Sequence, residues 1–392
     1  MGALVHDEVE WATLGGTSHA FSDAMAGAKG RLAVVMRAFE GGGAQRDMVL
    51  LCNALALAGM DVTILALRSE GPLRALLAPS VQVLDLPGHR IRYALPGLRR
   101  TIRSLAPRLV VSSESNLNLF TLMAVRSLPR SVRPKLVLRE VGSPSLARRH
   151  DPHRQNRIAY RLLRLYRLAD RILTFTQGAR DDLVANFAVP ARKIAVMPTN
   201  AILPPDVVAR LAAWDGETGR SDDLIVSVGR LSPEKDHALL LRAVALLPAA
   251  LPWRLALVGD GPERAALEAL AARSGLSDRI TFTGYVPDPF AWMMQARVAV
   301  CSSIYEGLGN AVVEALACGT PVVSTDCPYG PREILQDGRY GTLVPVGDAP
   351  ALAAAIAAAL QRPVDRRDLT RRGFNYSAER AAACFLDLTS DL

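Results

Sequence analysis

The sequence has 392 residues, half of them apolar and 21% charged, a composition typical of a soluble protein of about two domains. Lys and Arg outnumber Asp and Glu by 46 to 38, but residues 1–200 carry a net charge of +13 and residues 201–392 carry −5. No apolar run is long enough to span a bilayer. The five cysteines are widely spaced and form no C-x-x-C pair, which argues against a disulfide framework or a zinc site and favours a reducing compartment.

The first ten residues contain three acidic side chains, Asp7, Glu8 and Glu10, where a signal peptide would have positive charge, so we expect residues 1–30 to be a mobile leader on a cytoplasmic protein. From Arg31 onward, short apolar segments alternate with helical stretches. This alternation predicts an α/β fold in which helices cover both faces of parallel sheets. The first series of predicted strands comprises residues 32–36, 62–67, 81–86, 109–112, 135–138, 172–175 and 194–197.

A polar stretch at residues 215–223 separates this series from a second one. The sequence therefore predicts two doubly wound parallel-sheet domains, one over residues 31–205 and one over residues 206–376, with the linker inside 200–222. Parallel sheets of this kind bind ligands at the carboxyl ends of their strands, so the expected site is the cleft between the domains. The second series of predicted strands comprises residues 224–228, 254–258, 280–283, 298–301 and 322–325.

Two cations follow the first strand of the second domain. Gly229 lets the chain turn off the strand, and Arg230 and Lys235 flank the turn into the next helix. Two cations beside the positive end of a helix suit a diphosphate. The alternative is a pair of surface cations at an ordinary turn between a strand and a helix.

The next two strands end in glycine turns. Gly259-Asp260-Gly261 begins like a dinucleotide-binding fingerprint, but Arg264 occupies the position of its last glycine, so a tight turn is the favoured interpretation. The following turn offers an exposed backbone that could receive a flat base, at Gly284, Tyr285 and Val286.

The segment 302–315 combines two carboxylates with a glycine loop. Glu306 lies in the loop, and Glu314 lies eight residues later in the helix that the loop opens. Because carboxylates repel phosphate, we expect them to accept hydrogen bonds from sugar hydroxyls, one from a transferred sugar and one from a ribose. The alternative is an exposed Glu followed by a capping Glu. Backbone amides in the loop and the first helical turn have no intrahelical partner, so we expect them to bind phosphate oxygens. These amides are those of Gly307, Leu308, Gly309 and Asn310.

The run from Glu306 to Thr325 resembles the signature of the family 4 retaining glycosyltransferases, which have the GT-B fold. The resemblance covers nearly the whole chain from Arg31. It implies two Rossmann-like domains that face a cleft, with a nucleotide-sugar donor held mostly by the second domain and an acceptor held by the first. It also implies that a C-terminal helix, about residues 377–392, crosses back onto the first domain. Three further motifs match in order and spacing: Gly41–Arg46, Gly229-Arg230-Leu231 with Lys235, and Gly259–Pro262.

The resemblance also implies a role for each donor motif. Arg230 and Lys235 would neutralise the diphosphate and stabilise the leaving group, while Glu306 would hold the transferred sugar. A ribose would bind Glu314, and a first-domain loop would approach the diphosphate at Gly42 and Gly43. The chain has no Asp-x-Asp pair, so we expect no metal and no cofactor beside the nucleotide-sugar co-substrate.

The acceptor site departs from the family pattern. Many members place a histidine in the cleft of the first domain, but Val141 occupies that position here. The segment 326–334 is similar to members that build lipid-linked or cell-surface glycans, so a glycan or a polyprenyl-diphosphate-linked acceptor is expected. The first-domain candidates for contact with it are Arg46, Asn116, Arg139 and Glu140.

Arginines cluster in two segments of the first half. Residues 151–171 predict a helix with one cationic face beside an apolar stripe of Ile158, Leu162 and Leu165. One interpretation is that both arginine clusters are solvated helix faces. The alternative is that the arginines bind anionic lipid headgroups, which would make the protein peripheral on the inner face of the cell membrane. Nucleic acid is disfavoured because aromatic residues make up only 5%. The arginines are Arg154, Arg157, Arg161 and Arg164 in this segment, and Arg90, Arg92, Arg99, Arg100, Arg103 and Arg108 in the other.

The favoured function is transfer of a hexose or N-acetylhexosamine from a nucleotide-diphosphate sugar to a lipid-linked or cell-surface glycan. One rival is a sugar-nucleotide epimerase of the GT-B fold, which would need no acceptor. A second rival is a noncatalytic homologue that binds a glycan.

Overall fold

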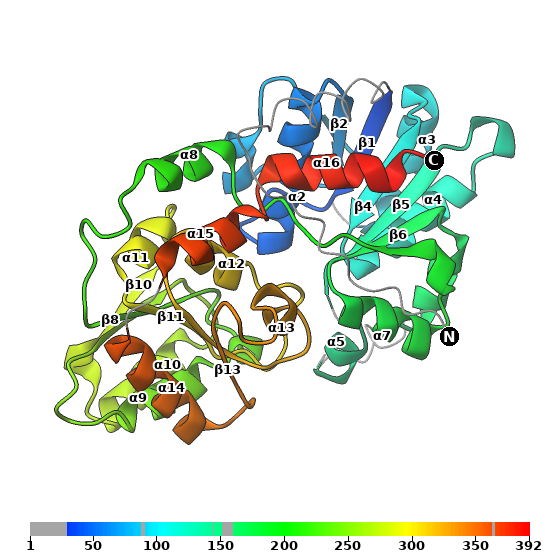
Figure 1. Cartoon of the computed structure of the whole chain (residues 1–392). Coiled ribbons are helices and arrows are strands. Elements are labelled where there is room, and N and C mark those ends of the chain that lie inside the picture. The colour runs from blue at the N-terminus through cyan, green and yellow to red at the C-terminus, as the bar shows by residue number, and fades with distance from the viewer. Residues whose placement is uncertain (1–29, 88–90, 143, 151–159, 363–364) are drawn as a thin grey trace, which may run out of the picture.

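The computed structural model describes residues 30–87, 91–142, 144–150, 160–362 and 365–392, which form two α/β domains (Figure 1). Each domain contains one parallel sheet with helices on both sides, which confirms the predicted fold class. Residues 1–29 of the leader expected at residues 1–30, and the arginines Arg90, Arg154 and Arg157, lie outside the described residues.

The N domain has a sheet of seven parallel strands in the order β3-β2-β1-β4-β5-β6-β7. Successive side chains of a strand point to opposite faces, so Leu32 and Val34 of β1 join one apolar layer while Ala33 and Val35 join the other. The strands are β1 (Arg31–Met36), β2 (Asp61–Ala66), β3 (Gln82–Asp85), β4 (Leu109–Ser113), β5 (Lys135–Glu140), β6 (Arg171–Thr174) and β7 (Ile194–Val196).

The C domain has a sheet of six parallel strands in the order β10-β9-β8-β11-β12-β13. Its edge strand β13 is absent from the sequence prediction because it has only three residues, of which Val344 alone is buried. The strands are β8 (Leu224–Val228), β9 (Arg254–Val258), β10 (Ile280–Gly284), β11 (Val298–Cys301), β12 (Val322–Thr325) and β13 (Thr342–Val344).

Helices connect the strands and cover the sheets. In the first part of the chain they are α2 (Gly43–Leu57), η1 (Pro72–Leu76), α3 (Ile91–Leu105), α4 (Ser115–Arg126), η2 (Arg130–Val132), α5 (Pro144–His150), η3 (Leu162–Leu168), α7 (Gln177–Phe187), η4 (Ala191–Lys193) and α8 (Pro205–Ala213). In the second part they are η5 (Pro233–Lys235), α9 (His237–Ala245), α10 (Arg264–Arg273), η6 (Ser277–Arg279), α11 (Phe290–Gln295), α12 (Asn310–Ala317), α13 (Pro331–Ile334), α14 (Ala349–Gln361), α15 (Arg366–Phe374) and α16 (Ala378–Thr389). Elements marked η are 3₁₀ helices.

The chain crosses between the domains twice, and the two crossings lie side by side. The amides of Ile202 and Leu203 both donate to the carbonyl of Tyr376 at 3.1 Å, and Ala378 donates back to the carbonyl of Leu203 at 2.9 Å. After the second crossing α16 packs on α2, where the side chain of Phe385 is fully buried (Figure 1). The last helix therefore completes the N domain.

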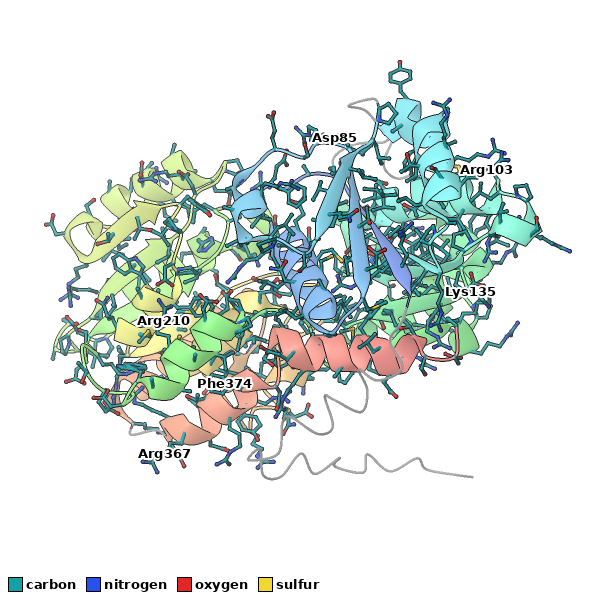
Figure 2. All side chains as sticks on the ribbon, turned by 90° about the horizontal axis from the view of Figure 1, so that it is seen from above. Asp85, Arg103, Lys135, Arg210, Arg367 and Phe374 are labelled. Carbon is teal, nitrogen blue, oxygen red and sulfur yellow. The ribbon has the colours of Figure 1, made fainter. Side chains whose placement is uncertain are left out.

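The two arginine segments differ in structure. On α3 the side chains of Arg99, Arg100 and Arg103 are exposed, and Figure 2 shows Arg103 at the end of the molecule remote from the C domain. In the other segment the described residues form η3, which buries Leu163 and Tyr166 and exposes Leu162. Of the expected apolar stripe, Ile158 lies outside the described residues, Leu165 is half-buried against the core and Leu162 is exposed, because a 3₁₀ helix repeats every three residues. None of the described helices has the length and apolar character needed to cross a bilayer.

Candidate active site

The loop after β8 presents two cations at the carboxyl edge of the C domain. Pro233 opens the short helix η5, and Asp236, with a φ of 42°, turns the chain and caps α9 by accepting from the Leu239 amide at 3.0 Å. The side chain of Arg230 is exposed, whereas that of Lys235 is half-buried at the end of η5. The two cations therefore lie in different environments, Arg230 in solvent and Lys235 partly inside the protein.

Lys235 pairs with Glu306. Its Nζ lies 2.6 Å from Glu306 Oε1, which also accepts a hydrogen bond of 2.7 Å from Ser303. Burial alone would lower the pKa of Lys235, but the carboxylate of Glu306 outweighs this effect and raises it above the ordinary value. The ammonium therefore stays charged throughout the physiological range.

Backbone contacts tie three loops of the C domain together. The amide of Ile304 donates to the carbonyl of Glu234 at 2.8 Å, and Ser302 Oγ donates to the carbonyl of Lys235 at 2.8 Å. The amide of Glu306 donates to the carbonyl of Pro328 at 2.9 Å. The loops after β8, β11 and β12 thus form one cluster that fixes the Lys235–Glu306 pair.

The glycine loop brings the C domain against the N domain. A Cβ at Gly307 would lie 1.9 Å from the carbonyl oxygen of Val141, so only glycine allows this approach. Gly309, with a φ of 100°, then caps α12 at Asn310. The amides of the loop therefore lie where the two domains meet, at the start of α12.

Glu314 is buried inside α12 and pairs with the N domain. Its Oε1 lies 2.5 Å from Nη1 of Arg46 on α2. Burial raises the pKa of Glu314 and the charge of Arg46 partly offsets that rise. Arg46, expected at the acceptor, instead contacts the carboxylate expected at the ribose.

Sequence reasoning missed a buried carboxylate, Asp47, next to Arg46. Asp47 is 3% exposed, and burial raises its pKa to about 7. Asn310 Nδ2 donates to its two oxygens at 2.8 and 3.0 Å, and Asn200 Nδ2 donates to Oδ2 at 2.7 Å. Asn200 is in turn held by Arg139, whose Nη2 donates to Asn200 Oδ1 at 2.7 Å.

Two of the four acceptor candidates lie inside the N domain. Arg139 is fully buried and stacks over the Phe175 ring at 4.8 Å. Glu140 is 2% exposed and accepts hydrogen bonds from Tyr166 Oη at 2.7 Å and from Ser115 Oγ at 2.9 Å. Burial raises the pKa of Glu140 to about 7. Unlike these two, Asn116 on α4 is exposed.

The expected base site lies at the end of β10. Gly284 ends the strand with a φ of 72°, and the Tyr285 ring that follows is 64% exposed. A Cβ at Gly41 would lie 3.9 Å from this ring, so Tyr285 faces the glycine run of the N domain. Val286 is half-buried and packs on the apolar core. In that glycine run, Gly42 caps α2 and Gly43 begins it.

Among the described residues, no group of three or more His, Cys, Asp or Glu side chains lies close enough together to hold a metal ion. The residues described above bring together a cation paired with a carboxylate, a second buried carboxylate, and the N-terminus of α12.

Comparisons with known proteins agree with this architecture. Residues 42–200 match the family described as glycosyl transferase 4-like domain, and residues 222–362 match glycosyl transferases group 1. One relative is N-acetylgalactosamine-N,N'-diacetylbacillosaminyl-diphospho-undecaprenol 4-alpha-N-acetylgalactosaminyltransferase from Campylobacter jejuni. It is 30% identical over 253 residues, which cover 64% of this chain and 66% of that protein. The lipopolysaccharide core glycosyltransferase LpsE from Rhizobium meliloti is 33% identical over 206 residues, 53% of this chain and 55% of its own. The matches thus span between about half and two thirds of these relatives' length.

Solved structures share the arrangement of the two domains. Anabaena HepE in complex with UDP and glucose has a TM-score of 0.71 at 20% identity and covers 93% of this chain and 100% of its own. The lipopolysaccharide galactosyltransferase WaaB has a TM-score of 0.69 at 16% identity and covers 92% of this chain and 100% of its own. These likenesses establish the GT-B fold, and the family matches extend over most of both domains. The chain therefore belongs to the group 1 glycosyltransferases.

Proposed function

We propose that the chain transfers a hexose or N-acetylhexosamine from a nucleotide-diphosphate sugar to a glycan acceptor with retention of the anomeric configuration. The Lys235–Glu306 pair carries this proposal, because it joins a cation for the diphosphate to a carboxylate for sugar hydroxyls in one fixed cluster. Glu314, four residues into α12, is the carboxylate assigned to the ribose.

In the proposed reaction the bond between the anomeric carbon and the phosphate oxygen breaks. The acceptor oxygen bonds to that carbon from the same face, and its proton goes to the leaving phosphate. Lys235 and Arg230 stabilise the charge that grows on the leaving group, while the amides of Gly307–Asn310 donate to phosphate and sugar oxygens. These groups replace a divalent cation, so we expect turnover to persist in excess EDTA.

The remaining donor contacts come from both sides of the cleft. The exposed ring of Tyr285 is assigned to the base, together with the backbone of Gly284 and Val286. Gly42 and Gly43, at the start of α2, are assigned to the side of the diphosphate opposite Lys235.

For the acceptor we propose a lipid-linked or cell-surface glycan on the cytoplasmic face of the membrane. The Campylobacter relative is named for a diphospho-undecaprenol-linked acceptor and the Rhizobium relative for the lipopolysaccharide core. Among the first-domain candidates, Asn116 is the exposed one, and we assign the acceptor contact to it.

A thermal-shift screen against UDP-, GDP- and ADP-sugars, followed by a transfer assay with a polyprenyl-diphosphate-linked glycan, tests the proposal. A donor that binds only the native state raises the melting temperature by mass action. The anomeric configuration of the product, read by NMR, decides retention. A product with inverted configuration would contradict the mechanism. Epimer formed from donor alone would identify an epimerase, and binding without turnover of any donor would identify a noncatalytic homologue.

A further inference from the structure

Two pairs of side chains join α2 of the N domain to α12 of the C domain. Arg46 and Asp47 are neighbours in the first turns of α2, and their partners Glu314 and Asn310 lie one turn apart on α12. The Arg46–Glu314 contact is 2.5 Å long, and Asn310 Nδ2 reaches both oxygens of Asp47 at 2.8 and 3.0 Å. We call these two contacts the α2–α12 clasp.

The Asp47 side of the clasp is anchored deep in the N domain. Asn200, next to the crossing between the domains, donates to Asp47 Oδ2 at 2.7 Å, and the fully buried Arg139 holds Asn200. A buried carboxylate is costly unless its oxygens accept hydrogen bonds, so Asp47 needs the Asn310 amide from the other domain. The N domain alone leaves this group incompletely satisfied.

The Asn310 side of the clasp belongs to the donor loop. Asn310 is the first residue of α12 and follows directly on Gly309, so its side-chain contact with Asp47 holds the N-terminus of α12 against the N domain. A displacement of α2 therefore moves the donor loop or breaks the hydrogen bonds to Asp47.

We propose that Asp47 is a positioning residue that holds the domains closed and, through Asn310, sets the donor loop for catalysis. The part of this proposal that concerns the donor loop rests on the proposed function, whereas the part that concerns domain closure does not. The clasp thus couples the relative position of the domains to donor binding.

A charge exchange across the clasp tests this proposal. Asn310→Asp places two carboxylates in contact, which repel at about pH 9 where both are ionised. The double variant Asp47→Asn with Asn310→Asp restores the pair, because Asn at 47 can donate to Asp at 310 and still accept from Asn200. Asn186→Asp is the matched control, since Asn186 donates to the buried Asp182 at 2.6 Å within α7 alone.

Solution X-ray scattering of the full chain measures how closed the two domains are, without any substrate. We expect a larger radius of gyration for Asn310→Asp than for the wild type, a wild-type value for the double variant, and no change for Asn186→Asp. An unchanged radius in Asn310→Asp, or a double variant that stays open, would overturn the proposal.

Steady-state kinetics with the nucleotide sugar measure the effect of the clasp on the donor loop. We expect Asn310→Asp to raise KM for the donor about tenfold, the equivalent of about 1.4 kcal/mol. The double variant keeps the carboxylate at position 310, so recovery of KM in it assigns the loss to the clasp, and an unrecovered KM refutes that assignment. If no donor is turned over at all, the proposed function fails while the scattering result still decides the clasp.

Discussion

Lys235 and Glu306 form an ion pair in a half-buried position. Their atoms are 2.6 Å apart, and their side chains are 24% and 10% exposed. Such a pair holds a cation ready beside a phosphate without the cost of an isolated buried charge. Of the two cations after β8, Lys235 is therefore the preorganised one, whereas the side chain of Arg230 is exposed.

We expect Lys235→Ala to lower kcat by a factor of about 100 to 1,000, the usual effect of removing one preorganised group that stabilises the leaving charge. Arg273→Ala, which removes an exposed cation at the end of α10, serves as the control and is expected to keep wild-type turnover. Circular dichroism checks that both variants fold. A folded Lys235→Ala variant with wild-type kcat would disprove the role of this cation.

His237 follows two residues after Lys235 and is only 2% exposed. Burial, reinforced by the charge of Lys235, lowers its pKa to about 4. Within the described part of the chain its Nδ1 has no hydrogen-bond partner. The imidazole is therefore neutral in the folded protein at pH values where it would be protonated in the unfolded chain.

This difference predicts an acid-sensitive fold. Between pH 6.5 and 4 the unfolded state binds a proton that the folded state does not, so stability falls as the pH falls through this window. From about pH 7.5 to about pH 5 the wild type should lose about 2 kcal/mol more than His237→Gln, which cannot titrate. Urea unfolding of both proteins at the two pH values measures this. Parallel pH profiles would exclude His237 as the cause.

Close backbone contact between neighbouring loops explains two glycines of the C domain. A Cβ at Gly259 would lie 2.0 Å from the carbonyl oxygen of Gly229, inside the same domain, and the φ of Gly259 is 140°. A Cβ at Gly307 would instead meet Val141 of the other domain at 1.9 Å. The first contact fixes the loops after β8 and β9 to each other, and the second fixes one domain against the other.

The two glycines should therefore respond differently to alanine. We expect Gly259→Ala to destabilise the protein by about 3 kcal/mol, because overpacking and backbone strain add within one folded unit. Gly307→Ala should change the melting temperature much less, since the domains can separate slightly, but it should reduce turnover. Thermal unfolding and a transfer assay on both variants make the comparison. If both variants lost the same stability, the two domains would not separate at the Gly307 contact, contrary to this prediction.

The strands could be predicted because strands buried on both faces of a parallel sheet are continuous apolar runs. Four of them, β8, β9, β11 and β12, have the predicted bounds. The prediction ended β5 at Leu138, whereas the strand continues to Glu140. For this reason Arg139 and Glu140, expected in the cleft, are buried within the sheet.

Asp47 could have been found from the pattern of α2. It lies on the same helix face as Leu51, Ala54 and Leu55, all of which are buried, and a charged residue on such a face needs a partner. The partner itself could not be predicted, because Asn310 is 263 residues away in the chain. Pairs across the cleft depend on how the two domains dock, and no local pattern encodes that.

Beyond the clasp, hydrogen bonds between α13 and the start of α7 also join the two domains. Glu333 of α13 accepts hydrogen bonds from the amides of Gln177 and Gly178, at 3.1 and 3.4 Å, at the positive end of α7. α16 returns to α2, whereas α3 lies on the part of the N domain away from the C domain (Figure 1). Three arginines with exposed side chains, Arg99, Arg100 and Arg103, lie on α3.

The exposed arginines of α3 should bind an anionic membrane. Arg99, Arg100 and Arg103 lie on the helix that also exposes 64% of the Tyr93 side chain, an aromatic suited to the headgroup region. Each cation near such a surface contributes about 1 kcal/mol, so changing all three to Gln should weaken binding to anionic vesicles about a hundredfold.

The matched control changes three exposed arginines of the C domain, Arg273, Arg362 and Arg367, to Gln. Figure 2 shows Arg367 and Arg103 at opposite ends of the molecule, so equal changes of net charge are made on two different surfaces. Co-sedimentation with phosphatidylglycerol vesicles should separate the two variants at low salt, and the difference should shrink as salt screens it. Equal binding by both would mean that only net charge matters, and binding insensitive to salt would exclude an electrostatic membrane surface on α3.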